Sequence, residues 1–473
     1  MGEEKDWLFD DDEILKTIHR YEDMMNRNAQ YFFDVHEIEG IINYYIDTNN
    51  FKMAVSAAEY GIQLYPESSV IQLKIAHLLI DRGKVSESIN ILNRLELLEA
   101  SNYEVFILKG TAFNMLGKTN EAARLFDRAV ELTTENRHEV LYNIGMSFEQ
   151  QLQYKTAIRY FLQAYRTDPD NYTILYDLAY CYDCANEYDL SIKYYDLFLD
   201  EDPFSDHAWF NLGNVYNRSG QNDKALEAYD FAIAINQEYN SAYFNKGNIL
   251  SNMERYTEAL KEYLDFITFE ENNVMALCYI GECYEKLKQI DNSLFYFQKA
   301  IALDPNCADA WFGEGVLKMQ LGLYDESIAR LQRALELSED NTEYLYVLGL
   351  VFMRKKDIKM GLSIFKQVTE LDPSDCEAWL NYSELFFMND QIGEAIEILN
   401  KAYDLNYKNP FINVRLATYY FIKGNTKSGI QYLEKALTID PDCSGDLVEF
   451  LPDALNNVQI KKLIENYTKQ NLD

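Results

Sequence analysis

A spacing of 34 residues runs through this chain from about residue 35 to residue 443. Steps of this length, with one extra residue near 133–137, meet a small residue at twelve places. The twelve places hold Ala54, Ser88, Ala122, Ala157, Ser191, Ala225, Ala259, Ser293, Ser327, Gly361, Ala395 and Gly429. Self-similarity at such a period is typical of a solenoid, in which each unit buries its apolar face only against its neighbours. The period therefore predicts one continuous all-helical array of about twelve units.

A second column of small residues stands twelve positions before the first, and only Ile42 in the first unit is large. The column holds Ala76, Gly110, Gly145, Ala179, Gly213, Gly247, Gly281, Gly315, Gly349, Ser383 and Ala417. Small residues at both places allow two antiparallel helices to approach closely. Bulky residues surround them, with Trp209, Trp311 and Trp379 at one shared position of the first helix. An aromatic column in the second helix holds Phe126, Phe161, Tyr195, Tyr229, Tyr263, Phe297 and Phe365.

Prolines and glycines punctuate the unit. Six of the chain's eight prolines share one column, at which the second helix is expected to have ended, because proline cannot continue a helix. They are Pro66, Pro169, Pro203, Pro305, Pro373 and Pro441. The turn between the two helices holds Gly83, Gly117, Gly220, Gly322 and Gly424.

The clearest unit, residues 206–239, carries the whole pattern except the proline, which Gln237 replaces. Its pattern residues are Trp209, Leu212, Gly213, Tyr216, Ala225, Tyr229 and Ala232. This pattern resembles the tetratricopeptide repeat (TPR) family. The resemblance implies an all-α fold, a right-handed α-solenoid superhelix of about twelve helix-turn-helix units with capping helices. The units are expected to begin near residues 35, 69, 103, 138, 172, 206, 240, 274, 308, 342, 376 and 410.

The chain ends are expected to cap the array, since terminal repeats need a polar outer face. Residues 1–34 are read as an acidic segment and a capping helix, residues 35–443 as the repeats, and residues 444–473 as capping helices. Apolar residues at helical spacing support both caps: Ile14, Leu15, Ile18, Tyr21 and Met25, then Ile460, Leu463, Ile464 and Tyr467. Residues 7–9, Trp-Leu-Phe, lie outside these faces; they are either a short partner-binding motif or a segment that folds back onto the array.

Catalytic chemistry finds little support in the sequence. The five histidines are scattered without metal-ligand spacing, and the glycines belong to the repeat rather than to a phosphate loop. Cys181 and Cys184 form one CxxC pair, which is either half of a zinc or redox site or an inward packing position shared with Cys283 and Val215. Packing is favoured. We expect no catalytic residue, no cofactor, no metal and no small-molecule substrate.

Location and partner class follow from composition. The first residues lack the basic and then apolar order of a secretory signal, no apolar run is long enough to span a membrane, and the cysteines are odd in number and irregularly spaced. A cytoplasmic protein without membrane insertion is expected. The formal net charge of −34 also argues against nucleic acid as a partner.

The negative charge is uneven along the chain. Residues 172–205 carry eight acids against Lys193 alone. The acids are Asp177, Asp183, Glu187, Asp189, Asp196, Asp200, Glu201 and Asp202. This stretch either keeps the protein soluble or attracts a basic partner segment.

The family resemblance also implies where a partner would bind. In proteins that resemble this one, the first helices line a concave groove in which extended peptides lie. The corresponding positions predict partner-binding residues Tyr142, Tyr176, Tyr180, Asp183, His207, Phe210, Asn214, Asn217, Phe244, Asn248 and Asn252. Asp177, from the acidic stretch, is predicted to bind the partner as well. Aromatic faces and side-chain amides at these positions suit an extended backbone.

One specificity within the family is disfavoured. The subset that binds chaperone C-terminal tails needs lysines where this chain has Tyr142, Tyr176, Phe210 and Met275, although Asn211 and Asn245 match its asparagine place.

The sequence therefore predicts a non-catalytic scaffold or adaptor that binds an extended, possibly basic segment of a partner protein in its groove. The alternative is an assembly or regulatory chaperone that holds one client transiently. A hydrolase or transferase hidden in the groove is a remote third reading.

Overall fold

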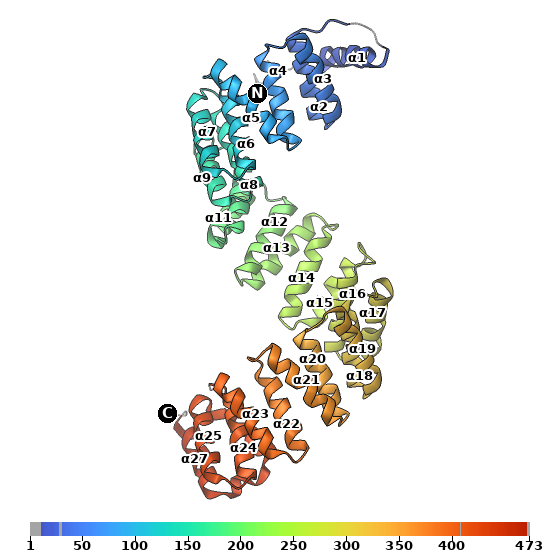
Figure 1. The fold of residues 1–473 in the computed structure, drawn as a ribbon, viewed down its shortest axis with the longest axis vertical. Coiled ribbons are helices and arrows are strands. Elements are labelled where there is room, and N and C mark those ends of the chain that lie inside the picture. Colours follow the sequence, from blue (N-terminus) through green and yellow to red (C-terminus); the bar gives the residue numbers. More distant parts are fainter. Residues whose placement is uncertain (1–10, 28–30, 407, 471–473) are drawn as a thin grey trace. The chain divides into compact units, whose positions relative to one another are not determined.

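The computed structural model describes residues 11–27, 31–406 and 408–470, and this part of the chain contains helices but no strand. The Trp-Leu-Phe motif at residues 7–9 lies outside the described residues. The chain divides into two compact units, residues 1–237 (unit 1) and residues 238–473 (unit 2). Figure 1 shows the successive helices of each unit, from blue to green in unit 1 and from green to red in unit 2.

The helices of unit 1 are α1 (Asp11–Arg27), α2 (Val35–Asp47), α3 (Phe51–Leu64), α4 (Ser69–Asp81), α5 (Val85–Leu98), α6 (Tyr103–Met115), α7 (Thr119–Leu132), α8 (Arg137–Gln150), α9 (Tyr154–Thr167), α10 (Thr173–Cys184), α11 (Tyr188–Glu201), α12 (Asp206–Arg218) and α13 (Asn222–Ile235).

The helices of unit 2 are α14 (Asn240–Asn252), α15 (Tyr256–Phe266), α16 (Val274–Lys286), α17 (Ile290–Leu303), α18 (Ala308–Gln320), α19 (Tyr324–Leu337), α20 (Thr342–Arg354), α21 (Ile358–Leu371), α22 (Cys376–Met388), α23 (Ile392–Leu405), α24 (Pro410–Ile422), α25 (Thr426–Ile439), α26 (Ser444–Phe450) and α27 (Val458–Gln470), with short 3₁₀ helices at Pro441–Cys443 and Pro452–Asn456.

The helices from α2 to α25 form twelve consecutive pairs over the described residues, six in each unit. Each pair consists of a first helix with an even number and a second helix with an odd number, and the two pack against each other. The predicted all-α solenoid of about twelve units is confirmed. Within each unit, each pair buries its apolar face against the next, because neither helix has enough apolar surface to form a core alone.

The two small-residue columns serve the contact within each pair. In the first helix, a Cβ atom added to Gly213 would lie 2.7 Å from Cε1 of Tyr229, and one added to Gly145 would lie 2.5 Å from Cε1 of Phe161. The aromatic column of the second helix therefore lies directly against the small column of the first. A side chain larger than hydrogen would displace the ring, which explains why glycine recurs here.

Serines in the other small column add a hydrogen bond to this packing. The Ser191 hydroxyl donates to the Ala179 carbonyl at 2.8 Å, and the Ser327 hydroxyl donates to the Gly315 carbonyl at 2.7 Å. Each bond joins the second helix to the first helix of the same pair. A buried hydroxyl is tolerated here because it has this partner.

The turn within each pair adopts a left-handed backbone. Gly220 has φ 77°. In repeats that have no glycine at this position, the residue there still has positive φ, as at Leu152 (58°) and Lys356 (66°). Glycine adopts this conformation without steric cost, whereas leucine and lysine do not. Turn geometry is thus kept even where the sequence signal disappears.

The tryptophan and proline columns meet between successive pairs. The indole N–H of Trp209 donates to the carbonyl of Pro203 at 3.0 Å, and Trp311 donates to Pro305 at 3.0 Å in the same way. The indole thereby fixes the loop that precedes its own helix. Two columns that the sequence shows as separate signals therefore form one joint.

The caps agree with the predicted apolar faces except at two positions. Ile18 and Tyr21 of α1 are buried, whereas Leu15 and Met25 are 42% and 50% exposed. The buried face of α1 includes Thr17 instead, because the helix packs on α2 over a narrower stripe than predicted. In α27, Ile460 is buried and Tyr467 packs on the same cluster.

Candidate functional site

The first helices of successive pairs contact one another within each unit, and we call them the inner layer. In unit 1, α4, α6 and α8 line a depression of about 630 Å³ whose walls include Lys74, Glu104 and Met146. In unit 2, α16, α18 and α20 form most of a depression of about 390 Å³. The inner layer is therefore hollowed in both units.

Hydrogen bonds between residues 35 positions apart join neighbouring first helices. In unit 1 the Tyr142 hydroxyl donates to the Asp177 carboxylate at 2.8 Å, and the Asn211 amide donates to the Tyr176 hydroxyl at 2.7 Å. In unit 2 the Asn381 amide donates to the Tyr346 hydroxyl at 3.0 Å. In all three hydrogen bonds, a tyrosine at the fifth place of one 34-residue repeat bonds the residue at the sixth place of the next repeat. Part of the predicted binding surface therefore holds the fold together.

The aromatic residues predicted to line the groove each pack one ring face on the core. The ring centroids of Tyr176 and Tyr195 are 5.7 Å apart, and those of Phe210 and Tyr229 are also 5.7 Å apart. Phe244 packs on Phe266 in unit 2, with ring centroids 5.0 Å apart. These rings are half-buried.

The other predicted residues differ in exposure. Tyr180, His207, Asn217 and Asn252 are exposed, and the His207 ring contacts the Asp206 carboxylate. Tyr142, Tyr176, Phe210, Asn214 and Asp177 are half-buried in unit 1, and Phe244 and Asn248 are half-buried in unit 2.

Asp183 is not the solvent-facing residue that the sequence suggested. It is 7% exposed and forms an ion pair with Arg218 of α12. The Asp183 carboxylate links the first helices α10 and α12. The sequence could not reveal this link, because Arg218 lies 35 residues away along the chain. A charge-reversing substitution of Asp183 would therefore break this internal ion pair and would not test whether Asp183 contacts a partner protein.

Asp177 lies in a small polar cluster between α8 and α10. The thiol of Cys181 contacts the Glu149 carboxylate at 3.7 Å, close to Asp177 and Tyr142. Burial and, to a smaller extent, the nearby charge of Asp177 together raise the pKa of Glu149 to about 7, although the hydrogen bond from the Cys181 thiol opposes them. Burial also raises the pKa of Asp177, although the hydrogen bond from Tyr142 opposes this. Burial raises the pKa of Cys181 as well, so this thiol is a weak nucleophile and fits the packing interpretation.

The asparagines at the ninth place of the unit are oriented by the second helix. The Tyr229 hydroxyl donates to Oδ1 of Asn214 at 2.7 Å, and the Tyr263 hydroxyl donates to Oδ1 of Asn248 at 2.7 Å. The amide oxygen therefore has an internal donor in both cases. The expectation that these amides both accept from and donate to a partner backbone needs correction, because the accepting atom is engaged.

The acidic stretch 172–205 contributes few charges to the inner layer. Only Asp177 and Asp183 stand on the first helix, whereas Asp189, Asp196 and Asp200 are exposed on the second helix α11. These exposed acids therefore lie on the other layer of the array.

A more open group of acids lies in unit 2, where the sequence gave no signal. Glu282, Glu285 and Glu343 line the depression of α16, α18 and α20, with Lys286 beside them. Glu282 and Glu343 are exposed, and Glu285 pairs with Lys286 at 3.2 Å. The three acids come from two helix pairs of unit 2 that are separate in sequence, so their grouping depends on how the helices pack.

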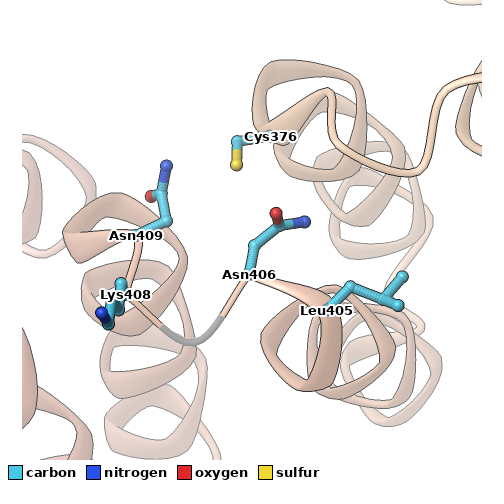
Figure 2. A pocket seen from close by; sticks show the side chains of 5 residues that line it. All are labelled: Cys376, Leu405, Asn406, Lys408 and Asn409. Atoms are coloured by element: carbon cyan, nitrogen blue, oxygen red, sulfur yellow. The ribbon is translucent and has the colours of Figure 1, made fainter.

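Figure 2 shows a further depression, of about 400 Å³, in which the Cys376 thiol and the side chains of Asn406 and Asn409 surround the opening. Its polar groups serve the fold. The Asn406 amide donates to the Pro373 carbonyl at 3.1 Å, and the Asn409 amide oxygen caps α24 by accepting from the Ile412 N–H at 3.1 Å. It lies between the start of α22 and the loop that joins α23 to α24, away from the inner-layer depressions.

Family models match most of these helix pairs. Models described as tetratricopeptide repeat or TPR repeat match residues 142–206, 207–239, 241–273, 274–307, 315–356, 342–375 and 412–443, more than half of the chain. The chain belongs to the tetratricopeptide repeat family. The TPR repeat supports a protein-interaction scaffold in general, and such scaffolds are typically non-catalytic.

Solved structures similar to this TPR protein include MamA, which is 26% identical over 34% of this chain and 95% of its own, with a TM-score of 0.33. YrrB, described as a TPR protein with an unusual peptide-binding site, is 27% identical over 38% of this chain and 92% of its own, with a TM-score of 0.32. The Cut9–Hcn1 hetero-tetramer contains a chain that is 14% identical, over 92% of this chain and 99% of its own, with a TM-score of 0.41. All three TM-scores are low, so the family assignment rests on the repeat matches.

No curated protein sequence matches this TPR protein. Among its described residues, no helix is both long enough and apolar enough to cross a membrane.

Proposed function

We propose that this TPR protein is a scaffold that binds an extended segment of a partner protein along its inner layer. The observation that carries the proposal is the hollowing of this layer, where successive first helices line a depression in each unit. An extended segment could lie across several first helices and contact each of them, as in groove-binding peptide recognition.

The proposed contacts in unit 1 are the residues with exposed or half-exposed side chains on α10 and α12, the first helices that follow the depression of α4, α6 and α8 and do not line it. Tyr180 is 38% exposed, Asn217 is exposed, and the outer faces of Tyr176 and Phe210 lie on the same helices. Aromatic side chains supply most of the binding energy in many interfaces. In unit 2, Phe244, Asn248 and Asn252 of α14 are the corresponding proposed contacts, with the Asn248 amide nitrogen directed by the bond that holds its oxygen.

The partner segment is proposed to be polar or basic. The net charge of −34 favours approach of a basic segment at long range. The acid Glu343 of the unit 2 depression offers a short-range contact to it, and Glu282 offers another when it is ionised, since burial and the charge of Asp309 raise the pKa of Glu282 to about 7. Affinity is therefore expected to fall as salt screens these charges.

The test begins with capture of partners from native cell extract by the full chain, followed by mass spectrometry and reconstitution with the purified partner. Two inner-layer variants follow: Tyr180→Ala with Asn217→Ala, and Glu282→Lys with Glu343→Lys. The control is Phe295→Ala, which removes an aromatic side chain that is 60% exposed on the second helix α17.

We expect at least one inner-layer variant to weaken binding about tenfold or more, since interface hot spots cost about 2 kcal/mol or more, and the control to bind normally. Normal binding by both inner-layer variants, or loss of binding in the control alone, would place the contact elsewhere. Stoichiometry separates the two readings of function. A scaffold holds two or more partners at once, whereas an assembly chaperone holds one client and releases it.

A further inference from the structure

Two cysteines that are 29 residues apart in sequence meet in unit 2. The Sγ atoms of Cys278, in α16, and Cys307, just before α18, are 3.8 Å apart. This is a contact between two reduced thiols, and a disulfide bond requires the sulfurs to approach to about 2.05 Å. Helices α16 and α18 contact each other directly, so the two thiols belong to neighbouring elements.

Cys307 stands at the position where a thiolate is favoured by the backbone. It is the N-cap residue of α18, and its thiol makes no capping hydrogen bond, although the nearby N–H of Ala310 favours the thiolate form. A helix start stabilises negative charge, and its free N–H groups point toward the cap residue. The hydrogen bond from the Cys278 thiol is the largest cause that lowers the pKa of Cys307, and the Ala310 N–H adds to it.

Burial and the carboxylates of Asp304 and Asp309 act in the opposite direction and raise the pKa of Cys307. The two donors outweigh these groups, so the pKa of Cys307 lies below its usual value. The same hydrogen bond raises the pKa of Cys278, which therefore keeps its proton. The two thiols are thus chemically different.

Exposure differs in the same sense. Cys278 is 3% exposed and belongs to a buried cluster with Leu277 and Phe297. Cys307 is half-exposed, and Pro305 and Asn306 in the loop before it are exposed. Cys307 is therefore the more accessible of the two thiols, while Cys278 is shielded by the core cluster against which Cys307 packs.

We propose that Cys278 and Cys307 form a reversible redox site that closes to an intramolecular disulfide when a hydroperoxide oxidises it. Cys307 is the attacking residue and Cys278 is the resolving residue. Hydrogen peroxide is the simplest oxidant of this class.

The chemistry takes two balanced steps. In the first, the Cys307 thiolate attacks one peroxide oxygen, an S–O bond forms, the O–O bond breaks, and the departing hydroxide takes a proton to become water. In the second, the Cys278 sulfur attacks the sulfenic sulfur of Cys307 as it loses its proton. The S–S bond forms, the S–O bond breaks, and hydroxide leaves with that proton as a second water. The peroxide is reduced by two electrons, and the two thiols supply them.

Metal binding is a weaker explanation for the pair. Zinc sites take four ligands, and among the described residues no three His, Cys, Asp or Glu side chains group so that they could hold a metal ion. Cys181 and Cys184, which are close in sequence, are less suited to this chemistry, because the Cys181 thiol contacts the Glu149 carboxylate, whose negative charge disfavours a thiolate. Spatial contact, rather than CxxC spacing, marks the reactive pair in this chain.

The disulfide would join two successive helix pairs, α16 with α17 and α18 with α19. Because each pair contacts only its neighbours, the added constraint acts locally. Opening of α16 away from α18 is therefore slower in the oxidised protein, and the helices of unit 1 are unaffected.

The experiment uses the full chain, purified with reductant and then transferred to buffer without it. The protein is treated with hydrogen peroxide, the remaining thiols are alkylated, and peptides are mapped by mass spectrometry. The matched control is the thiol of Cys376, which also stands at a helix start and is half-exposed but contacts the Ser374 carbonyl at 3.6 Å instead of a second thiol. Burial raises the pKa of Cys376, so its thiolate is scarcer.

We expect one intramolecular Cys278–Cys307 disulfide, loss of the mass of two hydrogen atoms, and reversal by dithiothreitol. Cys307 is expected to react on the order of tenfold faster than Cys376, since the thiolate is the reactive form. A Cys278→Ala variant loses the thiol that lowers the pKa of Cys307, so its Cys307 is expected to oxidise more slowly and to stop at a sulfenic acid that a dimedone probe captures. Hydrogen exchange in α16 and the start of α18 is expected to slow after oxidation of the wild type and to stay unchanged in the variant.

Three outcomes would overturn the proposal: oxidation of other thiols while Cys278 and Cys307 stay reduced, a disulfide that forms only in denaturant, or crosslinks that join separate chains. A Cys307→Ser variant gives a second test, in which a hydroxyl suited to the N-cap position replaces the thiol. It is expected to fold normally and to lose the disulfide, and peroxide is expected to leave its Cys278 reduced.

Discussion

The inner layer of α8, α10 and α12 in unit 1 and that of α16, α18 and α20 in unit 2 use their acids differently. In unit 1, Asp177 accepts a hydrogen bond from Tyr142, and Asp183 forms an ion pair with Arg218. In unit 2, Glu282 and Glu343 are exposed at the edge of a depression. The acids of the most acidic stretch that stand on first helices are therefore engaged internally. Whether an acid is available to a partner therefore depends on which residue faces it from the neighbouring repeat.

The fifth place of the unit differs in a similar way between the two regions. Tyr142 and Tyr176 bond the next first helix in unit 1, whereas Cys278 and Phe312 occupy the same place in α16 and α18. Cys278 instead contacts Cys307. The glycines and aromatic rings between the paired helices already hold the helices together, so the fifth place is free to carry different chemistry.

The largest expected effect tests whether the shared packing is local. Gly213→Leu would drive a side chain into the Tyr229 ring, and overpacking of this kind costs about 1–3 kcal/mol. We expect faster hydrogen exchange in α12, α13 and their neighbours in unit 1, with unit 2 still protected. Gly393→Ala is the control, because a Cβ atom there meets nothing within 4 Å. Equal loss of protection across both units would contradict local packing.

A smaller effect tests the tyrosine bridges that the two units share. Tyr176→Phe removes the acceptor of the Asn211 amide, and Tyr346→Phe removes that of the Asn381 amide. Each change is expected to lower the free energy of unfolding by about 0.5–1.5 kcal/mol, because the amide loses its partner. Urea unfolding with exchange readouts from each unit measures this.

Tyr172→Phe serves as the control for the bridges, since its ring is 39% exposed and keeps its contact with Phe198. If only one of the two substitutions lowers the free energy of unfolding, the tyrosine hydrogen bond stabilises only that unit.

The smallest effect is pH-dependent and confined to unit 1. The pKa of Glu149 is raised from 4.5 to about 7, so the folded chain holds a proton that the unfolded chain has released across this range. Stability from this group is fully present below pH 4.5 and is lost as pH rises through about 7. Glu149→Gln does not titrate and is therefore expected to gain stability relative to the wild type as pH rises.

Urea midpoints at about pH 5 and about pH 8 measure this difference across the window. Glu139→Gln is the control, because this carboxyl is exposed on the same helix. A difference between Glu149→Gln and the wild type that is the same at both pH values would contradict a buried, protonated Glu149.

Much of the fold could be predicted from the sequence because its signals are local and repeated. The small column that includes Gly213, the aromatic column that includes Tyr229 and the proline column that includes Pro203 predicted the helix pairs and their number. The candidate site was predictable only in part. Exposed Tyr180 and Asn217 stand on the predicted layer, whereas Asp183 is buried by Arg218.

The sequence by itself determined the helix pairs, because each pair needs only small and aromatic residues at fixed spacings within one unit. Only the tertiary structure decided which polar side chains remain available. The Asp183–Arg218 pair, the acids around Glu282 and the contact of Cys278 with Cys307 each bring together residues from different helix pairs of the same unit, or from a helix pair and the loop that follows it. Burial and pairing set their charge and reactivity, and both depend on neighbours that lie roughly one repeat away along the chain and come together only when the pairs stack.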